Sequence, residues 1–316
     1  MSADRRNVLL IIVLGLTLGG MYFLAIDSQA PQFTFTQQQN AFDGNAGSPY
    51  RYRVLVPVLL EMGMRAFAFI GTPQQAFQAA SLTYECLGLT FQLVAMYAML
   101  RQFFAPIMAF VGVTFTAGMT VLTLAYFTYQ PWSILEVALF ALGFLLAYQG
   151  RWVWLTLVVV LASLNRETGV FLPLAIFLAS LSDFRKLRLR SMPRETVLAF
   201  GLVVLSTAIF LGLRLVRGSA EPVDQLSEVI RRNLERNNLI AAAMGVPLLL
   251  GFGWMYAALA WRSAPAFLRN IARVVPFYLA AFAIWGWWRE VRILTSLYPV
   301  LVPLVLVYCC KSRPVR

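Results

Sequence analysis

The sequence predicts an all-α protein, a polytopic bundle of transmembrane helices forming one domain over residues 1–316. Its composition is the first indication, because 60% of the residues are hydrophobic and only 13% are charged, about half the charged fraction of an ordinary soluble domain. The second is the recurrence of long apolar runs, several of which reach the roughly 17–25 residues needed to cross a bilayer core of about 30 Å. A soluble globular fold is therefore not expected.

The first apolar run, residues 8–26, directly follows a pair of arginines. It lacks the small-residue cleavage signature of a signal peptide, so we expect a retained helix. Positive residues flanking a span favour the cytoplasm, which places the N-terminus there. Residues 27–75 then form an outer loop, in which residues 54–71 are apolar but contain Pro57 and set Glu61 and Arg65 on one helical face.

Whether residues 54–71 cross the membrane decides the topology. If they cross, the strongly basic loop 185–194 faces outward; if they lie in the outer interface, that loop is cytoplasmic, as the positive-inside rule favours. We adopt the interfacial interpretation, which predicts about ten spans with both termini in the cytoplasm of a bacterial inner membrane. The spans after the first are 76–100, 103–127, 132–148, 152–164, 169–181, 196–216, 239–261, 274–288 and 293–310.

Two further outer features break the pattern of simple spans. Residues 152–164 and 169–181 are each too short to cross alone at 1.5 Å per residue, so the polar corner between them, residues 165–168, is expected below the outer surface. Polar backbone at that depth is tolerated where it is buried in protein or lines a wet cavity. Residues 217–238 have helical spacing of apolar and basic residues, which predicts an amphipathic segment on the outer leaflet.

Charged residues gather in three places on the predicted outer face. Arginine and tryptophan at span ends are also ordinary interfacial anchors, so each cluster alone has that simpler interpretation. Within spans, Glu85 and Glu136 are candidates for a site or for paired or protonated structural carboxylates. The three clusters are Asp43 with Arg51 and Arg53, then Arg166 with Glu167, then Arg289, Glu290 and Arg292.

At these clusters the chain resembles a known family. The segments PYRYRVLVP (49–57), NRET (165–168) and REVR (289–292), the last followed by a proline-bearing final span, are similar to those of polytopic glycosyltransferases of the GT-C superfold, especially bacterial ones. The resemblance implies a polyprenyl-phosphate-linked sugar as donor and an acidic residue of the first outer loop as catalytic base. Asp43 matches that position best and Asp27 is the second choice.

The resulting hypothesis is an inverting glycosyl transfer at the outer face. Asp43 is the expected base toward the acceptor hydroxyl, and Arg51, Arg53, Arg166, Arg289 and Arg292 are expected to stabilise the departing lipid phosphate. Glu167 and Glu290 orient neighbouring arginines. No cofactor is predicted with certainty: a divalent metal held by Asp27, Asp43 and Glu167 stays open, although the sequence contains no His.

The other expected partners are the bilayer and an acceptor whose identity the sequence leaves open; no nucleic acid is expected. A transporter or lipid flippase is the main alternative, because ten spans with buried charges and a broken helix also describe carriers. An assembly protein without chemistry is the third interpretation, and it explains the arginines only as anchors.

Overall fold

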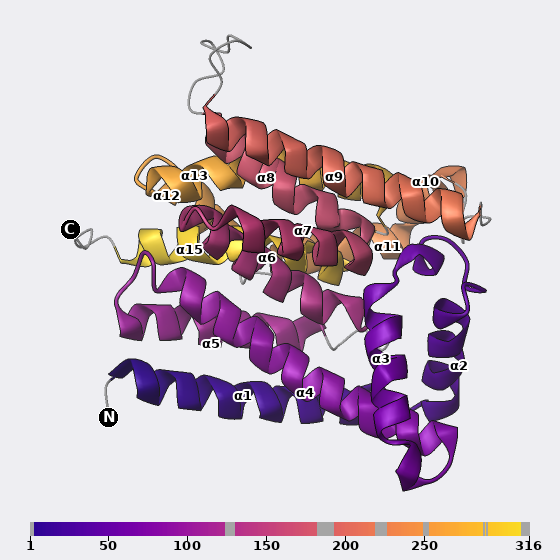
Figure 1. The fold of residues 1–316 in the computed structure, drawn as a ribbon. Helices are drawn as coiled ribbons and strands as arrows, with labels where there is room; N and C mark the ends of the chain where they lie inside the picture. The colour runs from indigo at the N-terminus through magenta and orange to yellow at the C-terminus, as the bar shows by residue number, and fades with distance from the viewer. Residues whose placement is uncertain are drawn as a thin grey trace.

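The computed structural model describes residues 3–123, 130–181, 193–218, 226–248, 253–286, 288 and 290–310. Within these ranges the regular secondary structure consists of α-helices and short 3-10 helices, without a β-strand, which confirms the all-α prediction. Most helices lie side by side along one direction (Figure 1). Helix α1 (Ala3–Ala25) begins and α15 (Tyr298–Cys309) ends at the same end of this bundle.

The helix bounds follow most of the predicted runs closely, and the last run begins as a 3-10 helix before it becomes α-helical. The other α-helices are α2 (Pro31–Phe42), α3 (Leu55–Ala66), α4 (Pro73–Leu100), α5 (Pro106–Thr123), α6 (Trp132–Tyr148), α7 (Trp152–Asn165), α8 (Phe171–Ser180), α9 (Arg194–Arg217), α10 (Leu226–Asn233), α11 (Arg236–Leu248), α12 (Gly253–Ala260), α13 (Ala266–Ile271) and α14 (Val275–Trp285). The 3-10 helices are η1 (Tyr50–Tyr52), η2 (Ala68–Ile70), η3 (Glu167–Val170), η6 (Ala272–Val274) and η7 (Val291–Leu297).

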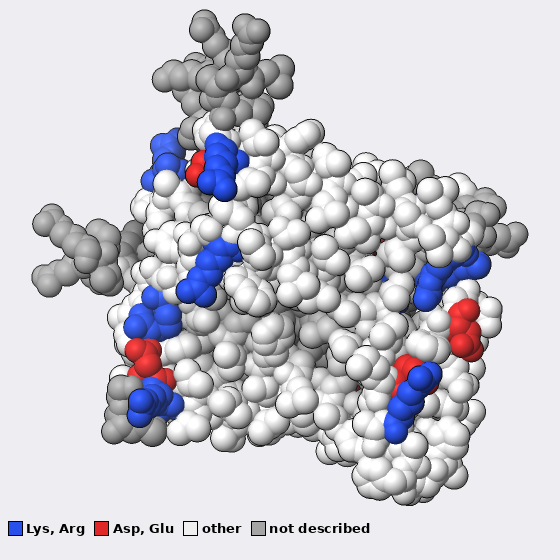
Figure 2. Space-filling model, in the orientation of Figure 1, with Lys and Arg blue, Asp and Glu red and all other residues white. Residues whose placement is uncertain are grey.

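Among the described residues, three helical stretches are long and apolar enough to cross a membrane: α1, α9 and Ala266–Trp285. Their outward side chains are apolar, as at Leu215 and Val216 of α9, which are 84% and 86% exposed. On the face in Figure 2 the charged side chains lie toward the two ends of the bundle, with an uncharged region between them. Together these features indicate a membrane protein, whereas ten spans stay a prediction.

Close packing of α1 on α4 depends on two glycines one helical turn apart. A Cβ atom at Gly15 would collide with the backbone of Thr90, and one at Gly19 would collide with the backbone of Cys86. Small residues at this spacing let two helix backbones approach closely in a membrane. The contact fixes the C-terminal half of α1 against α4, and with it the position at which residues 27–75 begin.

The outer loop is more ordered than its composition predicted. Residues 31–42 were expected as polar loop, but they form α2, with Pro31 in the first turn, where proline is well tolerated. The Gln38 amide donates to the carbonyl of Pro57 over 2.8 Å, which joins α2 to α3. Propensity missed this helix because its stability comes from packing of a polar sequence against α3.

Both α2 and α3 lie across the end of the bundle rather than along it (Figure 1). Arg65 and Glu61 form the expected pair on α3, with 2.9 Å between Nε and Oε1. This orientation is the one expected of a helix in the membrane interface; its location in an interface stays a prediction. Of the predicted segment 217–238, helix α10 and the start of α11 are described, while residues 219–225, like the basic stretch 182–192, lie outside the described residues.

Candidate functional site

A network of paired charges lies at the end of the bundle opposite the start of α1. Arg53, which follows η1, donates from Nη2 to Oε2 of Glu167 over 3.0 Å, and from Nε to both carboxylate oxygens over 3.2 and 3.3 Å. Arg53 is only 5% exposed. The structure thus joins two of the three predicted clusters, the first outer loop and the corner at residues 165–168.

Two aromatic rings and an amide hold Arg53 in place. Its guanidinium carbon lies 4.9 Å from the centre of the Tyr50 ring and 5.2 Å from that of Trp132, within the range of cation–π attraction. Arg53 also donates from Nη1 to Gln130 Oε1 over 3.3 Å, and Gln130 donates to the Tyr50 hydroxyl over 2.9 Å. Sequence analysis did not single out Gln130; the only available signal was that this amide stands two residues before the apolar run 132–148.

Arg166 forms the second pair of the network. Its Nη1 donates to Glu136 Oε2 over 2.9 Å, and the two side chains are 4% and 2% exposed. The Thr168 hydroxyl donates to the other oxygen of Glu136. Glu136 is therefore a paired carboxylate, one of the two alternatives that the sequence left open. The buried charges of Arg166 and Glu136 neutralise each other, as burial of charge requires.

A glycine makes the turn at this corner possible. A Cβ atom at Gly169 would collide with the carbonyl of Ala162 in α7, so only glycine lets η3 fold back so tightly on α7. The predicted break between two short apolar helices is observed here, and its side chains are buried: Asn165 is 0% exposed and Arg166 is 4% exposed. The corner is thus buried in protein, which is one of the two environments that the sequence allowed.

The third predicted cluster joins the network in part. Glu290 lies close enough to Arg166 to interact electrostatically. The Tyr278 hydroxyl donates to the carbonyl of Ile293 over 2.7 Å, which attaches η7 to the same region. Arg289 and the side chain of Arg292 lie outside the described residues.

Asp27 does not belong to this network. It is 1% exposed and accepts a hydrogen bond from the Ser81 hydroxyl of α4. Burial raises the pKa of the Asp27 carboxyl, and the hydrogen bond from Ser81 opposes that rise. Glu85 is 0% exposed, and neither of its oxygens nor Asp27 Oδ1 has a hydrogen-bond partner. Two buried carboxyls that lie close together disfavour each other's ionisation.

Asp43 is the candidate base that the structure leaves accessible. It is exposed and follows the last residue of α2, where its backbone N–H donates to the carbonyl of Gln39 over 2.9 Å. Its carboxylate has no partner among the described residues. The next residues fold back, and the N–H groups of Asn45 and Ala46 both donate to the carbonyl of Asn40, which holds the loop after Asp43 in place.

The open alternative of a metal held by Asp27, Asp43 and Glu167 finds no support in the arrangement of these residues. Among the described residues, no group of three or more His, Cys, Asp or Glu side chains comes together to hold a metal ion. Asp27 instead contacts Glu85, and Glu167 is engaged by Arg53.

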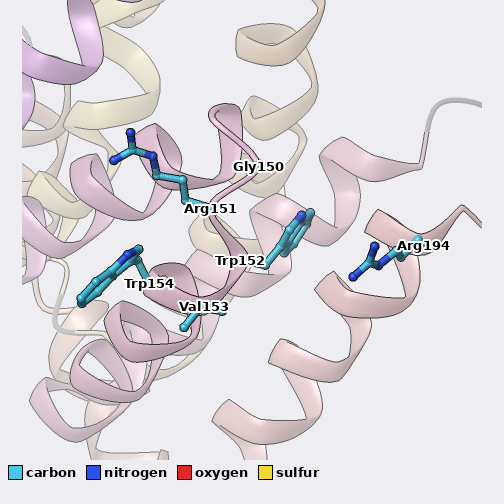
Figure 3. Close-up of a pocket in the computed structure, with 6 residues that line it drawn as sticks. All are labelled: Gly150, Arg151, Trp152, Val153, Trp154 and Arg194. Atoms are coloured by element: carbon cyan, nitrogen blue, oxygen red, sulfur yellow. The ribbon is translucent and has the colours of Figure 1, made fainter.

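An open surface pocket of about 470 Å³ lies at the opposite end of the bundle, where α7 and α9 begin. Its lining includes Arg151, directly before α7, and Arg194, at the start of α9, together with Trp152 and Trp154 (Figure 3). Arginine and tryptophan are the usual residues of a membrane interface. None of the three predicted clusters contributes to this pocket.

No protein family, curated protein or solved structure significantly matches this chain. The helical fold and the apolar helices define its class as a helical membrane protein, with a buried network of paired charges at one end.

Proposed function

We propose that the chain is an integral-membrane glycosyltransferase, which transfers a sugar from a polyprenyl-phosphate donor to an acceptor at the end of the bundle where α2 and α3 lie. One observation carries this proposal: the Arg53–Glu167 pair connects the first outer loop to the corner at residues 165–168, so polar groups that are distant in sequence meet at one end. Polar groups gathered at one end of the bundle suit a reaction at one membrane face better than transport of a cargo through the centre of the bundle.

The proposed reaction is a single inverting displacement. Asp43 takes the proton of the acceptor hydroxyl as the acceptor oxygen forms a bond to the anomeric carbon. The bond between that carbon and the phosphate oxygen breaks on the opposite side, and the polyprenyl phosphate leaves with the negative charge. Nearby guanidinium groups stabilise this charge in the transition state.

The observed pairing changes the roles proposed for the arginines. Arg53 and Arg166 each neutralise a carboxylate, so we assign them to positioning rather than to the donor phosphate. Arg51 keeps the proposed role at that phosphate, because its Nε is buried without a partner. Arg289 and Arg292 stay proposed donor contacts, and Glu290 stays a residue that orients them.

The proposed topology is ten spans in a bacterial inner membrane with both termini in the cytoplasm. It is supported by the common end at which α1 begins and α15 ends (Figure 1). The clusters then face the outer side, where lipid-linked sugars are presented to acceptors in the family that the sequence resembles.

The direct test is transfer by the purified protein in vesicles. Polyprenyl-phosphate sugars are supplied one at a time with hydroxyl-bearing lipid, glycan and peptide acceptors, and both the released polyprenyl phosphate and the glycosylated acceptor are measured. The proposal expects equal amounts of the two products with at least one donor. Donor breakdown that is not matched by acceptor glycosylation contradicts it.

A carrier of lipids or solutes is the second candidate, supported by the buried Asp27–Glu85 pair between the end of α1 and α4. Carboxyls at membrane depth are typical of proton relays in transporters. A carrier moves its cargo across the vesicle membrane without changing it, faster when a pH gradient is imposed. The transferase instead yields a covalently altered acceptor and needs no gradient.

A further inference from the structure

Three arginines from distant parts of the chain gather beside η1. Arg217, at the last turn of α9, donates from Nη1 to the carbonyls of Arg51 and Ala41 over 2.7 and 3.2 Å. The side chain of Arg51 reaches toward Gly218, which follows α9; a Cβ atom there would lie 3.9 Å from Arg51 Nη2. Arg214, one turn earlier in α9, lies over the ring of Tyr52 at 5.2 Å.

These cations have no matching anion in the described part of the chain. No ion pair joins Arg51, Arg214 or Arg217 to a carboxylate, in contrast to Arg53 and Arg166. Arg51 and Arg217 are close enough for their charges to act on each other, which is repulsive. In addition, the Nε of Arg51 is removed from water without an acceptor, and an unsatisfied buried donor is costly.

The position of the cluster identifies the kind of anion. α9 is one of the three candidate membrane spans, and Arg214 and Arg217 belong to its last turn. Leu215 and Val216 between them are highly exposed apolar residues, so the cluster lies where the lipid-facing surface of α9 ends. In a bilayer this is the level of the phosphate groups of lipids, which guanidinium groups bind in bidentate fashion.

We propose that Arg51, Arg214 and Arg217 form a binding site for the phosphate group of a membrane lipid. The phosphate oxygens accept from the N–H groups at the ends of the three guanidiniums, which relieves the mutual repulsion of Arg51 and Arg217. The site goes beyond the proposed function, because a protein can bind a lipid without catalysing a transfer reaction. Only the identification of this lipid with the glycosyl donor rests on the proposed function.

The test compares three probes on the purified protein in a neutral detergent: farnesyl phosphate, farnesol and inorganic phosphate. Native mass spectrometry of the titrated protein gives the bound fraction and Kd for each farnesyl probe, and inorganic phosphate is tested as a competitor. We expect farnesyl phosphate to bind at least about tenfold more tightly than farnesol, since charge-assisted hydrogen bonds add about 1.5–3 kcal/mol, and tenfold corresponds to about 1.4 kcal/mol. Raising the salt concentration weakens its binding.

Two single variants test the residues. Arg51→Gln removes a side chain that makes no hydrogen bond to the described part of the chain, and Arg214→Gln changes an exposed one, so both are expected to fold; each should weaken farnesyl phosphate binding about tenfold. Arg65→Gln on α3 makes the same charge change at a side chain that is 75% exposed and should leave Kd unchanged. Arg217→Gln is less informative alone, because it also removes two hydrogen bonds to backbone carbonyls.

Each outcome decides the proposal. Unchanged binding in the Arg51 and Arg214 variants, or equal binding of farnesol, overturns it. Full displacement by inorganic phosphate at the same concentration as the lipid also overturns it, because the site then selects free phosphate. Binding as predicted without any sugar transfer supports the site and counts against the proposed function, so the two failures are distinguishable.

Discussion

Arg53 and Glu167 are 114 residues apart in the sequence, yet their side chains meet with 3.0 Å between Nη2 and Oε2. Arg53 stands where the outer loop enters α3, and Glu167 stands where the chain turns from α7 to α8. The pair therefore fixes the outer loop relative to the bundle, and it is shielded from water at the arginine, whose side chain is 6% exposed.

Replacing Arg53 by Met should lower stability by about 3–5 kcal/mol, because it leaves Glu167 without its cation in a largely buried place. Exchanging both partners for Met should recover much of the loss, since two apolar side chains leave no charge unpaired. Thermal unfolding of the single and double variants in one detergent measures both effects. Additive losses in the double variant would mean that the pair contributes little by itself.

Arg166→Ala should be at least as damaging, because Glu136 is then left buried without a cation. Any loss of donor use in this variant then follows from misfolding rather than from a lost donor contact. Size-exclusion profiles and thermal unfolding should reveal the defect before activity is measured. A well-folded Arg166→Ala protein that fails only in donor binding would instead restore the role that the sequence indicated.

Glu85→Gln should keep the fold and raise the unfolding temperature at alkaline pH. Burial raises the pKa of Asp27, so the folded state favours the protonated carboxyl, and wild-type stability falls as pH rises through the folded pKa. The neutral amide of the variant removes the second buried carboxyl, and with it the part of the stability loss that comes from ionising that carboxyl. The advantage of the variant, of a few degrees, should grow with pH and shrink toward pH 5; Glu61→Gln on α3 is the exposed control. If the advantage of the variant does not change with pH, ionisation of Asp27 and Glu85 does not limit the stability of the wild-type protein.

The sequence predicted the helices well because the membrane imposes a simple rule of length and hydrophobicity. The bounds of α6, Trp132–Tyr148, match the predicted run at both ends, and the break at Asn165 was visible as two runs too short to cross. The pairing of Glu61 with Arg65 was also predictable, because a spacing of four residues fixes it within one helix.

Long-range pairing was not predictable in the same way. The sequence contains more arginines than carboxylates, and nothing local says that Glu136 pairs with Arg166 while Arg51 pairs with no carboxylate in the described part of the chain. Those choices depend on how α6, α7 and α9 pack together. Helix α2 was missed for a related reason: most of its residues are polar, and long-range contacts stabilise it, such as the Gln38 hydrogen bond to α3 and the packing of Phe35 on Phe77 of α4.

Accessibility of introduced cysteines tests the topology. Gln37 is exposed on α2 and Gln102 is exposed in the turn between α4 and α5, at opposite ends of the bundle (Figure 1). In a protein whose Cys86, Cys309 and Cys310 are replaced by Ser, we expect Gln37→Cys to react with a membrane-impermeant reagent in intact cells. Gln102→Cys should react only after the membrane is opened. Labelling of both from the same side would contradict the ten-span arrangement.

Asp43→Asn is the variant that decides the proposed mechanism. Asp43 is exposed at the end of α2 and its carboxylate has no described partner, so the nearly isosteric amide should leave insertion and stability unchanged. Turnover should fall by about 10² to 10⁴, the usual contribution of a positioned general base. Transfer is measured in vesicles, with the amount of folded protein checked by size exclusion.

Asp27→Asn is the matched control: its side chain is buried against Ser81, so it should alter stability more than turnover. If Asp27→Asn abolishes transfer while Asp43→Asn does not, the base is Asp27. If neither changes transfer, the reaction does not proceed through a carboxylate of this loop, and the carrier becomes the better account of the protein.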